Sequence, residues 1–337
     1  MSAQAASPFD LLLSRATLNS LGPTLLADAQ AAGRVLRLHA LEDIAADAAA
    51  TVHAAFISRD ITGKSTKHEI DTPLRDTYAV LRRSPQLAWV HTHSAGADRP
   101  IYGELRARGV AVSTSSGANA EVVAHTALAG LLALARRFPQ LMTAQREHRW
   151  APLQAAPPPR SIVGQTAVVV GYGPIARTLL PLLQLLGLQV RVVRHSPQAA
   201  AADVPTFTYA ELPAALAGAD WLILACPLSE QTRGLVDAAA LRVMPRGAQL
   251  INVSRGEVVV QDALVEVLQS GHLAGALLDV YEHEPLPADS PIWDLPNVIA
   301  TPHSAGYSDS HAPRVAGIFA DNLGRWLRGQ ALLHAIQ

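Results

Sequence analysis

The sequence predicts an α/β protein with two domains, each built on a doubly wound parallel sheet. The chain has 337 residues, which is the length of about two average domains. Short apolar stretches of strand length alternate with longer stretches that can form crossover helices. One glycine-rich turn joins such a strand to such a helix, as at the start of a doubly wound sheet.

The composition excludes several classes of protein. A net charge of −1 leaves no basic surface for nucleic acid. The single cysteine, Cys226, excludes an internal disulfide framework and fits the reducing cytoplasm, where we expect the protein to reside. No basic segment precedes an apolar stretch near residue 1, so no secretory signal is expected. The apolar runs are short and interrupted, so we expect no membrane span.

The first part of the chain, residues 34–114, has the alternation expected of a parallel sheet. Buried strands are expected at 52–57, 87–92 and 110–113. A helix follows at 120–135 and is apolar on almost every face. Such a helix must be covered by more than one neighbour, which predicts a homodimer. The prolines at 157–159 mark a boundary.

The second part of the chain carries the glycine turn. Strands are expected at 167–170, 190–193, 221–225, 248–253 and 275–278, and a helix at 175–186. Gly171 permits the turn, Gly173 lets a pyrophosphate approach the backbone, and Ala176 is small enough for helix–strand packing. The helix start offers free N–H groups to phosphates. This pattern predicts a dinucleotide site formed by Gly171, Tyr172, Gly173, Pro174 and Ile175 and, at later strand ends, by Arg194, His195, Ser196, Cys226, Pro227 and Val253.

The end of the second strand indicates which dinucleotide binds. NAD-specific units place an acidic residue there to bind the ribose 2′-hydroxyl. This chain has Arg194 instead, followed by His195 and Ser196. An arginine can hold a 2′-phosphate through charge-assisted hydrogen bonds. We therefore expect NADP(H) to be preferred and NAD(H) to remain possible; the alternative is that Arg194 only ends a strand in solvent.

Three further residues, far apart in sequence, follow later strands. They are Arg255, Glu284 and His303. Because the carboxyl ends of parallel strands meet at one crevice, these side chains can converge. An arginine binds a carboxylate, a histidine exchanges protons near neutral pH, and a carboxylate orients the imidazole. Taken alone, Arg255 would be read as a surface residue.

Other polar residues favour simpler interpretations. Glu282 and His283 are expected to be solvated loop residues. His91 and His93 alternate along a strand and are expected to line a pocket or to pack, so no metal site is predicted. Cys226 is expected to be a small buried hydrophobe and not a nucleophile.

At these motifs, and from about residue 87 to 322, the chain resembles the D-isomer-specific 2-hydroxyacid dehydrogenase family, especially its glyoxylate/hydroxypyruvate reductase branch. The resemblance implies that Arg255 binds the substrate carboxylate and keto oxygen. It implies that Glu284 pairs with His303, the acid–base residue, and that Asp279 lies near the nicotinamide. Residues 94–98 resemble the family's substrate loop, in which the amides of Ala95 and Gly96 would hold the carboxylate.

The resemblance also implies a domain arrangement and an activity. A Rossmann NAD(P)-binding domain, residues 115–303, would be inserted into a flavodoxin-like substrate domain of residues 1–114 and 304–337. The helix from Ala120 resembles the family's interdomain and dimer helix. The expected reaction transfers hydride from NAD(P)H, preferably NADPH, to a small 2-keto acid such as glyoxylate or hydroxypyruvate, giving the D-2-hydroxy acid.

Three related activities share this scaffold. Formate dehydrogenases carry a glutamine where Glu284 stands, which disfavours them. A phosphite-type dehydrogenase is compatible with Arg255, Glu284 and His303 but is disfavoured by the NADPH signal. Corepressors of the C-terminal-binding-protein type keep the same residues yet act as dinucleotide-regulated binding proteins. No extended disordered tail is expected here, which disfavours a scaffold role.

Overall fold

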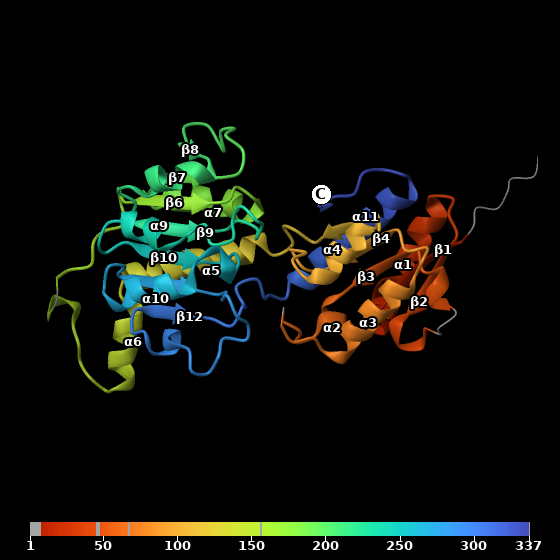
Figure 1. Ribbon diagram of the computed structural model, residues 1–337, viewed down its shortest axis with the longest axis horizontal. Coiled ribbons are helices and arrows are strands. Elements are labelled where there is room, and N and C mark those ends of the chain that lie inside the picture. Colours follow the sequence, from red (N-terminus) through yellow and green to blue (C-terminus); the bar gives the residue numbers. More distant parts are fainter. Residues whose placement is uncertain (1–7, 45–47, 67, 156, 337) are drawn as a thin grey trace, which may run out of the picture. The chain divides into compact units, whose positions relative to one another are not determined.

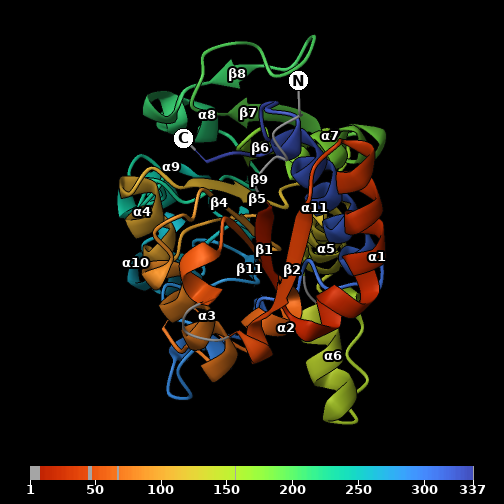
Figure 2. The same ribbon diagram turned by 90° about the vertical axis from the view of Figure 1, so that its right-hand side faces the viewer.

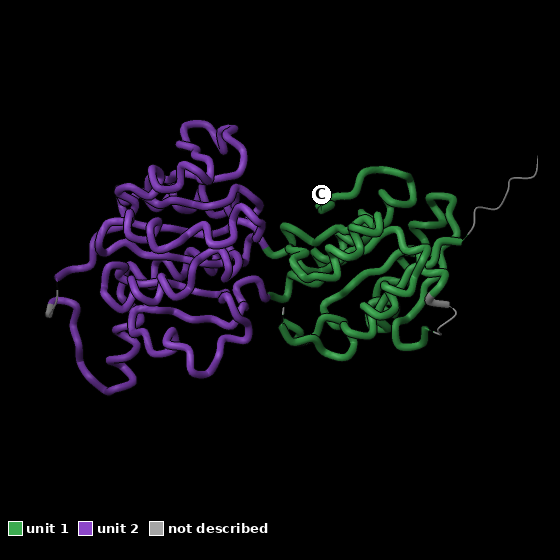
Figure 3. Tube along the Cα trace, viewed as in Figure 1, with its two compact units in different colours: residues 1–119, 308–337 green, residues 120–307 purple. Residues whose placement is uncertain are grey.

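The computed structural model describes residues 8–44, 48–66, 68–155 and 157–336. The chain forms two compact units, residues 1–119 with 308–337 (unit 1) and residues 120–307 (unit 2) (Figure 3). Unit 2 is therefore inserted into unit 1. The chain passes between the units at 119/120 and 307/308, whereas the sequence predicts domain boundaries four or five residues earlier, at 114/115 and 303/304.

Unit 1 contains a five-stranded parallel sheet in the order β2-β1-β3-β4-β5. Its strands are β1 (Phe9–Leu13), β2 (Leu36–Ala40), β3 (Ala54–Ile57), β4 (Trp89–Thr92) and β5 (Ala111–Thr114). This is the flavodoxin-like order. The central strands are buried along their whole length, as expected when helices cover both faces.

Helices cover the two faces of this sheet in separate layers (Figure 2). On one face lie α1 (Arg15–Ala31) and α11 (His311–Leu327), and on the other lie α2 (Arg59–Thr62), α3 (Thr72–Arg83) and α4 (Pro100–Ala107). Successive strand residues serve opposite faces, so Leu11 packs with the α1–α11 layer and Leu12 with the α3–α4 layer. Phe319 of α11 stacks on Phe56 at 4.2 Å, which anchors the returning C-terminal segment to unit 1.

Unit 2 contains a seven-stranded parallel sheet in the order β12-β11-β10-β9-β6-β7-β8 (Figure 1). Its strands are β6 (Thr166–Val170), β7 (Gln189–Val193), β8 (Thr206–Phe207), β9 (Trp221–Leu224), β10 (Gln249–Asn252), β11 (Gly275–Leu278) and β12 (Val298–Ala300). Counted from β6, this is the Rossmann order 3-2-1-4-5-6 with one more strand. The strand order reverses between β6 and β9, where such sheets bind dinucleotides.

The helices of unit 2 also form two layers. One contains α5 (Ala120–Ala135) and α7 (Pro174–Leu185); the other contains α8 (Leu212–Leu216), α9 (Ala238–Val243) and α10 (Gln261–Gln269). A further helix, α6 (Phe138–Arg146), follows α5. Helix α5 packs so closely on β11 that a Cβ on Gly130 would lie 2.4 Å from Leu277 Cδ1. Among the described residues, no helix combines the length and apolarity needed to cross a membrane.

Helix α5 begins and ends where the sequence predicts, but it is not covered on every side. Its inward face is buried, whereas a stripe formed by Glu121, His125, Ala129 and Leu132 is exposed to solvent in the single chain. These positions recur every three or four residues, so they share one face of the helix.

Candidate active site

The turn after β6 contains two glycines, and each is required for a different structural reason. Gly171 has φ +100°, and a Cβ there would lie 2.8 Å from backbone atoms of Ala225 and Cys226, so only glycine fits. A Cβ on Gly173 would meet nothing within 4 Å. This open space precedes the first turn of α7, where free N–H groups can bind phosphate. The turn therefore fits the pyrophosphate of a dinucleotide.

The end of β7 is cationic, as the sequence predicts. Arg194 lies with its guanidinium carbon 5.6 Å from the centre of the Tyr172 ring, and Arg177 of α7 approaches the same ring at 5.3 Å. Beside them, His195 Nδ1 lies 2.8 Å from Gln231 Oε1, and Ser196 Oγ accepts a hydrogen bond from the backbone at 3.2 Å. The carboxylate that NAD-specific units place at this strand end is absent from the sequence here.

The remaining predicted cofactor residues follow β9 and β10. Cys226 is buried, and this burial raises the pKa of its thiol to about 12. The thiol is therefore protonated at neutral pH and is no nucleophile. Pro227 next to it is exposed, and Val253 is buried directly after β10. All of these residues lie at the carboxyl edge of the sheet.

Glu284 and His303 meet across the ends of β11 and β12. His303 Nδ1 lies 2.8 Å from Glu284 Oε2, while Glu284 Oε1 accepts a hydrogen bond from the Tyr281 amide at 3.1 Å. The carboxylate side chain is only 11% exposed, whereas the imidazole is 47% exposed. Because Nδ1–H donates to the carboxylate, Nε2 is the nitrogen available to exchange a proton with a substrate.

Asp279 holds the loop that carries His303. Its Oδ1 accepts hydrogen bonds from the Thr301 hydroxyl at 2.7 Å and the Ser304 amide at 2.8 Å, and its Oδ2 accepts one from the Ala305 amide at 2.9 Å. His303 itself has φ +50°, a left-handed backbone conformation that a non-glycine residue adopts at a cost. The hydrogen bonds to Asp279 stabilise this loop conformation.

Arg255 follows β10, the strand next to β11. Asn252 shapes the turn, since its side chain donates to the Arg255 carbonyl at 3.1 Å and accepts from the Ser254 hydroxyl at 2.8 Å. The next residue, Gly256, touches the loop after β11: a Cβ there would lie 1.8 Å from the carbonyl carbon of Tyr281. The strand ends that carry Arg255 and Glu284 are thus in backbone contact.

In unit 1, the predicted substrate loop follows β4. No described residue accepts a hydrogen bond from the amides of Ala95 or Gly96, so both remain available as donors. The Ser94 carbonyl accepts a hydrogen bond from the Ser115 amide at 3.0 Å, which ties the loop to the end of β5. Below it, His91 is fully buried and bonded to the hydroxyls of Ser113 and Ser115.

The two histidines of β4 and its end are packed and not grouped for metal. Burial, assisted by nearby charges, lowers the pKa of both His91 and His93 to about 3. His93 contacts the Thr62 hydroxyl at 3.0 Å. Within the described residues, no three His, Cys, Asp or Glu side chains gather as metal ligands would.

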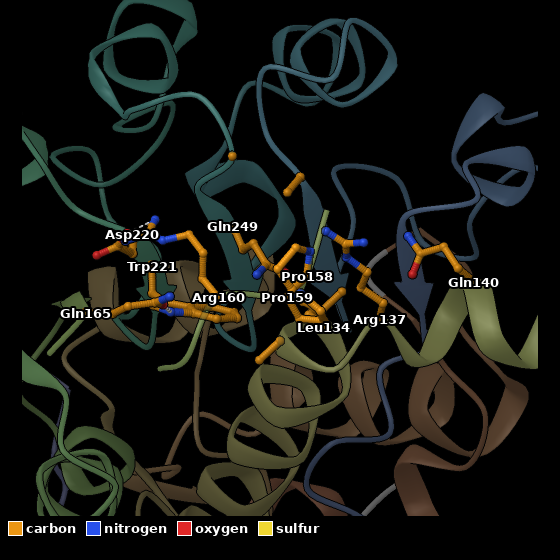
Figure 4. A pocket seen from close by; sticks show the side chains of 13 residues that line it. Leu134, Arg137, Gln140, Pro158, Pro159, Arg160, Gln165, Asp220, Trp221 and Gln249 are labelled. Carbon is orange, nitrogen blue, oxygen red and sulfur yellow. Dashed lines mark hydrogen bonds and ion pairs between the residues drawn. The ribbon is translucent and has the colours of Figure 1, made fainter. Parts of the chain in front are cut away.

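A cavity of about 230 Å³ lies at the opposite edge of the unit 2 sheet (Figure 4). It is lined by residues at the amino ends of strands, among them Trp221 and Gln249. Arg160 at its rim is paired with Asp220 at 2.6 Å. Because the glycine turn, Glu284 and His303 lie at the carboxyl ends, this cavity does not belong to the candidate active site.

Comparison with known proteins identifies the family. Residues 128–305 match the family described as D-isomer specific 2-hydroxyacid dehydrogenase, NAD binding domain. The chain is 39% identical over 251 residues to an (S)-sulfolactate dehydrogenase of Chromohalobacter salexigens, covering 74% of this chain and 80% of that one. The chain belongs to the D-isomer specific 2-hydroxyacid dehydrogenase family. It is an NAD(P)-dependent enzyme that interconverts 2-hydroxy and 2-keto acids.

Two further relatives agree with this assignment. A glyoxylate/hydroxypyruvate reductase B of Citrobacter koseri is 33% identical, with 75% of this chain and 78% of that chain aligned. The crystal structure of a D-isomer specific 2-hydroxyacid dehydrogenase from Xanthobacter autotrophicus Py2, in complex with NADPH and MES, superposes with a TM-score of 0.73 at 31% identity. That superposition covers 98% of each chain. The fold predicted from sequence is confirmed.

Three features of this dehydrogenase were not foreseen in the sequence. Arg177 was not recognised, although it lies on the ring of Tyr172. Asp279, which the resemblance places near the nicotinamide, also binds the loop of His303 through its carboxylate, a contact that no local pattern indicates. The backbone contact at Gly256 depends on a segment distant in sequence, so no local pattern could reveal it.

Proposed function

We propose that this dehydrogenase reduces a small 2-keto acid, such as glyoxylate or hydroxypyruvate, to the D-2-hydroxy acid and prefers NADPH. The Glu284–His303 pair carries this proposal. It lies at the same sheet edge as the glycine turn, with Nδ1 bound to the carboxylate and Nε2 open. Unit 2 would bind the dinucleotide, and unit 1 would supply the substrate loop.

Each proposed residue has one chemical task. Bound NADPH supplies the hydride that reduces the keto carbon. Arg255 binds the substrate carboxylate, assisted by the free amides of Ala95 and Gly96, and so fixes the keto acid for reaction. Protonated His303 donates its Nε2 proton to the developing alkoxide, and Glu284 stabilises the imidazolium that makes this donation possible.

The substrate side chain is tested with a panel. Glyoxylate, hydroxypyruvate and phenylpyruvate cover small, hydroxylated and aromatic substituents. 3-Sulfopyruvate joins them because one relative, at 39% identity, is named (S)-sulfolactate dehydrogenase. Oxidation of NADPH and of NADH is followed with each acid. If no 2-keto acid is reduced while both dinucleotides bind, the proposal fails.

His303→Ala tests the proton donor. The variant should lose at least a hundredfold in turnover, the usual scale of general acid catalysis, and keep its affinity for NADPH. His283→Ala, two residues after Tyr281 and outside the pair, is the matched control and should retain activity. Equal turnover of His303→Ala and the wild-type enzyme would remove His303 from this role.

Arg194→Asp tests the cofactor preference. Losing one charged contact and adding a repulsive carboxylate should weaken NADPH binding by roughly ten- to a hundredfold. NADH carries no 2′-phosphate, so its use should be unchanged or improved. A wild-type enzyme that prefers NADH, or an unchanged ratio of the two efficiencies in the variant, would contradict the proposal.

The proposed assembly is a homodimer. The exposed stripe of α5, formed by Glu121, His125, Ala129 and Leu132, is one face that a second copy could cover. Sedimentation of dilute protein should show twice the chain mass of 35.7 kDa. A single species at the mass of one chain would exclude the dimer.

A further inference from the structure

Two arginines share one aromatic ring at the end of the first two strands of unit 2. The guanidinium carbon of Arg177 lies 5.3 Å from the centre of the Tyr172 ring, and that of Arg194 lies 5.6 Å from it. Both distances are within the range of cation–π contacts. The two cations therefore lie at most about 11 Å apart, the sum of the two distances.

No described carboxylate neutralises either cation. Within residues 157–336, which include this whole region, no ion pair involves Arg177 or Arg194. Among the described residues, the Arg194 guanidinium makes one hydrogen bond, a long one of 3.5 Å to the Gln198 carbonyl. Two cations on one ring, neither paired with a carboxylate, repel each other, so a bound dianion would be favourable at this place.

The position of Arg177 strengthens this argument. It is the fourth residue of α7 (Pro174–Leu185), whose first turn contains no acidic residue. The helix dipole disfavours a positive charge near a helix N-terminus. An anion bound at the end of β7 would offset both this cost and the repulsion from Arg194.

We propose that Arg177 is a second cofactor-specificity residue, which together with Arg194 grips the 2′-phosphate of NADPH. The Tyr172 ring holds the two guanidiniums in place, so that less side-chain freedom is lost when the phosphate binds. This inference rests on the proposed NADPH preference and extends it from one residue to a clamp of two. The competing roles for Arg177 are a contact to the pyrophosphate, which NADH also carries, and exposure to solvent without a ligand.

The experiment uses two probes that separate these roles. Adenosine 2′,5′-diphosphate carries the 2′-phosphate without a pyrophosphate, and adenosine 5′-diphosphate carries a pyrophosphate without a 2′-phosphate. Their dissociation constants are measured by calorimetry with the full chain. Arg177→Gln should weaken the 2′,5′-diphosphate about tenfold and change the 5′-diphosphate less than twofold. Arg106→Gln, an exposed arginine of α4 in unit 1, is the matched control and should change neither.

The double variant of Arg177→Gln and Arg194→Gln tests the clamp itself. If both arginines grip one phosphate, their effects are coupled, and the double variant loses less than the product of the two single losses. Tyr172→Leu should also weaken the 2′,5′-diphosphate, whereas Tyr172→Phe, which keeps the ring, should bind like the wild-type protein.

Each other outcome overturns the inference. Equal weakening of both probes by Arg177→Gln would assign Arg177 to the pyrophosphate, and no weakening of either would leave it in solvent. Independent losses in the double variant would separate the two arginines. If the wild-type protein does not distinguish the two probes at all, the NADPH preference itself fails; if it does and Arg177→Gln has no effect, only the clamp fails.

Discussion

Replacing Gly256 by alanine tests whether backbone contact between two strand ends maintains the active site. The new Cβ would lie 1.8 Å from the Tyr281 carbonyl carbon, 2.0 Å from its oxygen and 2.3 Å from the Glu282 nitrogen. Non-bonded carbons prefer about 3.5–4.0 Å, so the two segments must separate by roughly 2 Å. The backbone that moves leads directly to Glu284, whose Oε1 accepts a hydrogen bond from the Tyr281 amide.

Two effects follow from this displacement. Forced overpacking should cost about 1–3 kcal/mol of stability. A displacement of about 1 Å at the pair of Glu284 and His303 should lower turnover on the order of a hundredfold. Both are measured on the purified variant, by thermal denaturation and by steady-state reduction of a 2-keto acid with NADPH.

Gly103→Ala is the matched control. Gly103 lies within α4, and a Cβ there would meet nothing within 4 Å. The same substitution should therefore leave activity unchanged and raise stability by about 0.5–1 kcal/mol, because alanine loses less conformational freedom in a helix. If Gly256→Ala behaves like Gly103→Ala, the argument from backbone contact is wrong.

Three further predictions concern protons and positioning. Glu284→Gln removes the charge that stabilises protonated His303, so the alkaline limit of the reduction rate should move to lower pH; an unchanged pH–rate profile would contradict the pairing. Asp279→Asn should lower turnover more than it changes NADPH affinity, and a purely cofactor-binding role would give the reverse. His91, with its folded-state pKa near 3 against 6.5 unfolded, binds a proton more readily when unfolded, so acid should destabilise the protein. The free energy of unfolding should fall by about 2 kcal/mol at pH 5, because pH 5 lies 1.5 units below the unfolded-state pKa and each unit corresponds to about 1.36 kcal/mol. His91→Gln should therefore flatten the dependence of the melting temperature on pH between 7 and 5.

The sequence was sufficient where a local pattern corresponds to a local structure. Helix α5 has the predicted bounds, and strands such as β6 and β10 lie within a residue of theirs. Long apolar helices and fully buried strands of a parallel sheet are recognisable because every residue in them is constrained.

Several of the elements that the sequence did not reveal are short or atypical, although β1 (Phe9–Leu13), which was also missed, is a fully buried strand of five residues. Strands β8 and β12 contain two and three residues, and none of these residues is fully buried, so neither has an apolar pattern. Helix α1 contains Pro23, a residue that normally interrupts a helix. These elements form because they pair with, or pack on, neighbouring elements, so they depend on the tertiary structure.

The candidate site shows the same division. Arg255, Glu284 and His303 were identified because strand ends of a parallel sheet share one edge, whatever their separation in sequence. The hydrogen bonds by which Asp279 supports the loop of His303 were not identified, because the partners of Asp279 lie 22 to 26 residues further along the chain.

Arg177 lies between these two situations. The sequence does contain an indication of its role, but the indication is the unfavourable position of a charge and not an apolar pattern. An arginine in the first turn of a helix, with no acidic residue in that turn, is unfavourable unless an anion lies nearby. The structure adds the second half of the argument by placing Arg194, from the end of the next strand, on the same Tyr172 ring. A charge that is unfavourable in the isolated fold is therefore best explained by the ligand that the fold binds.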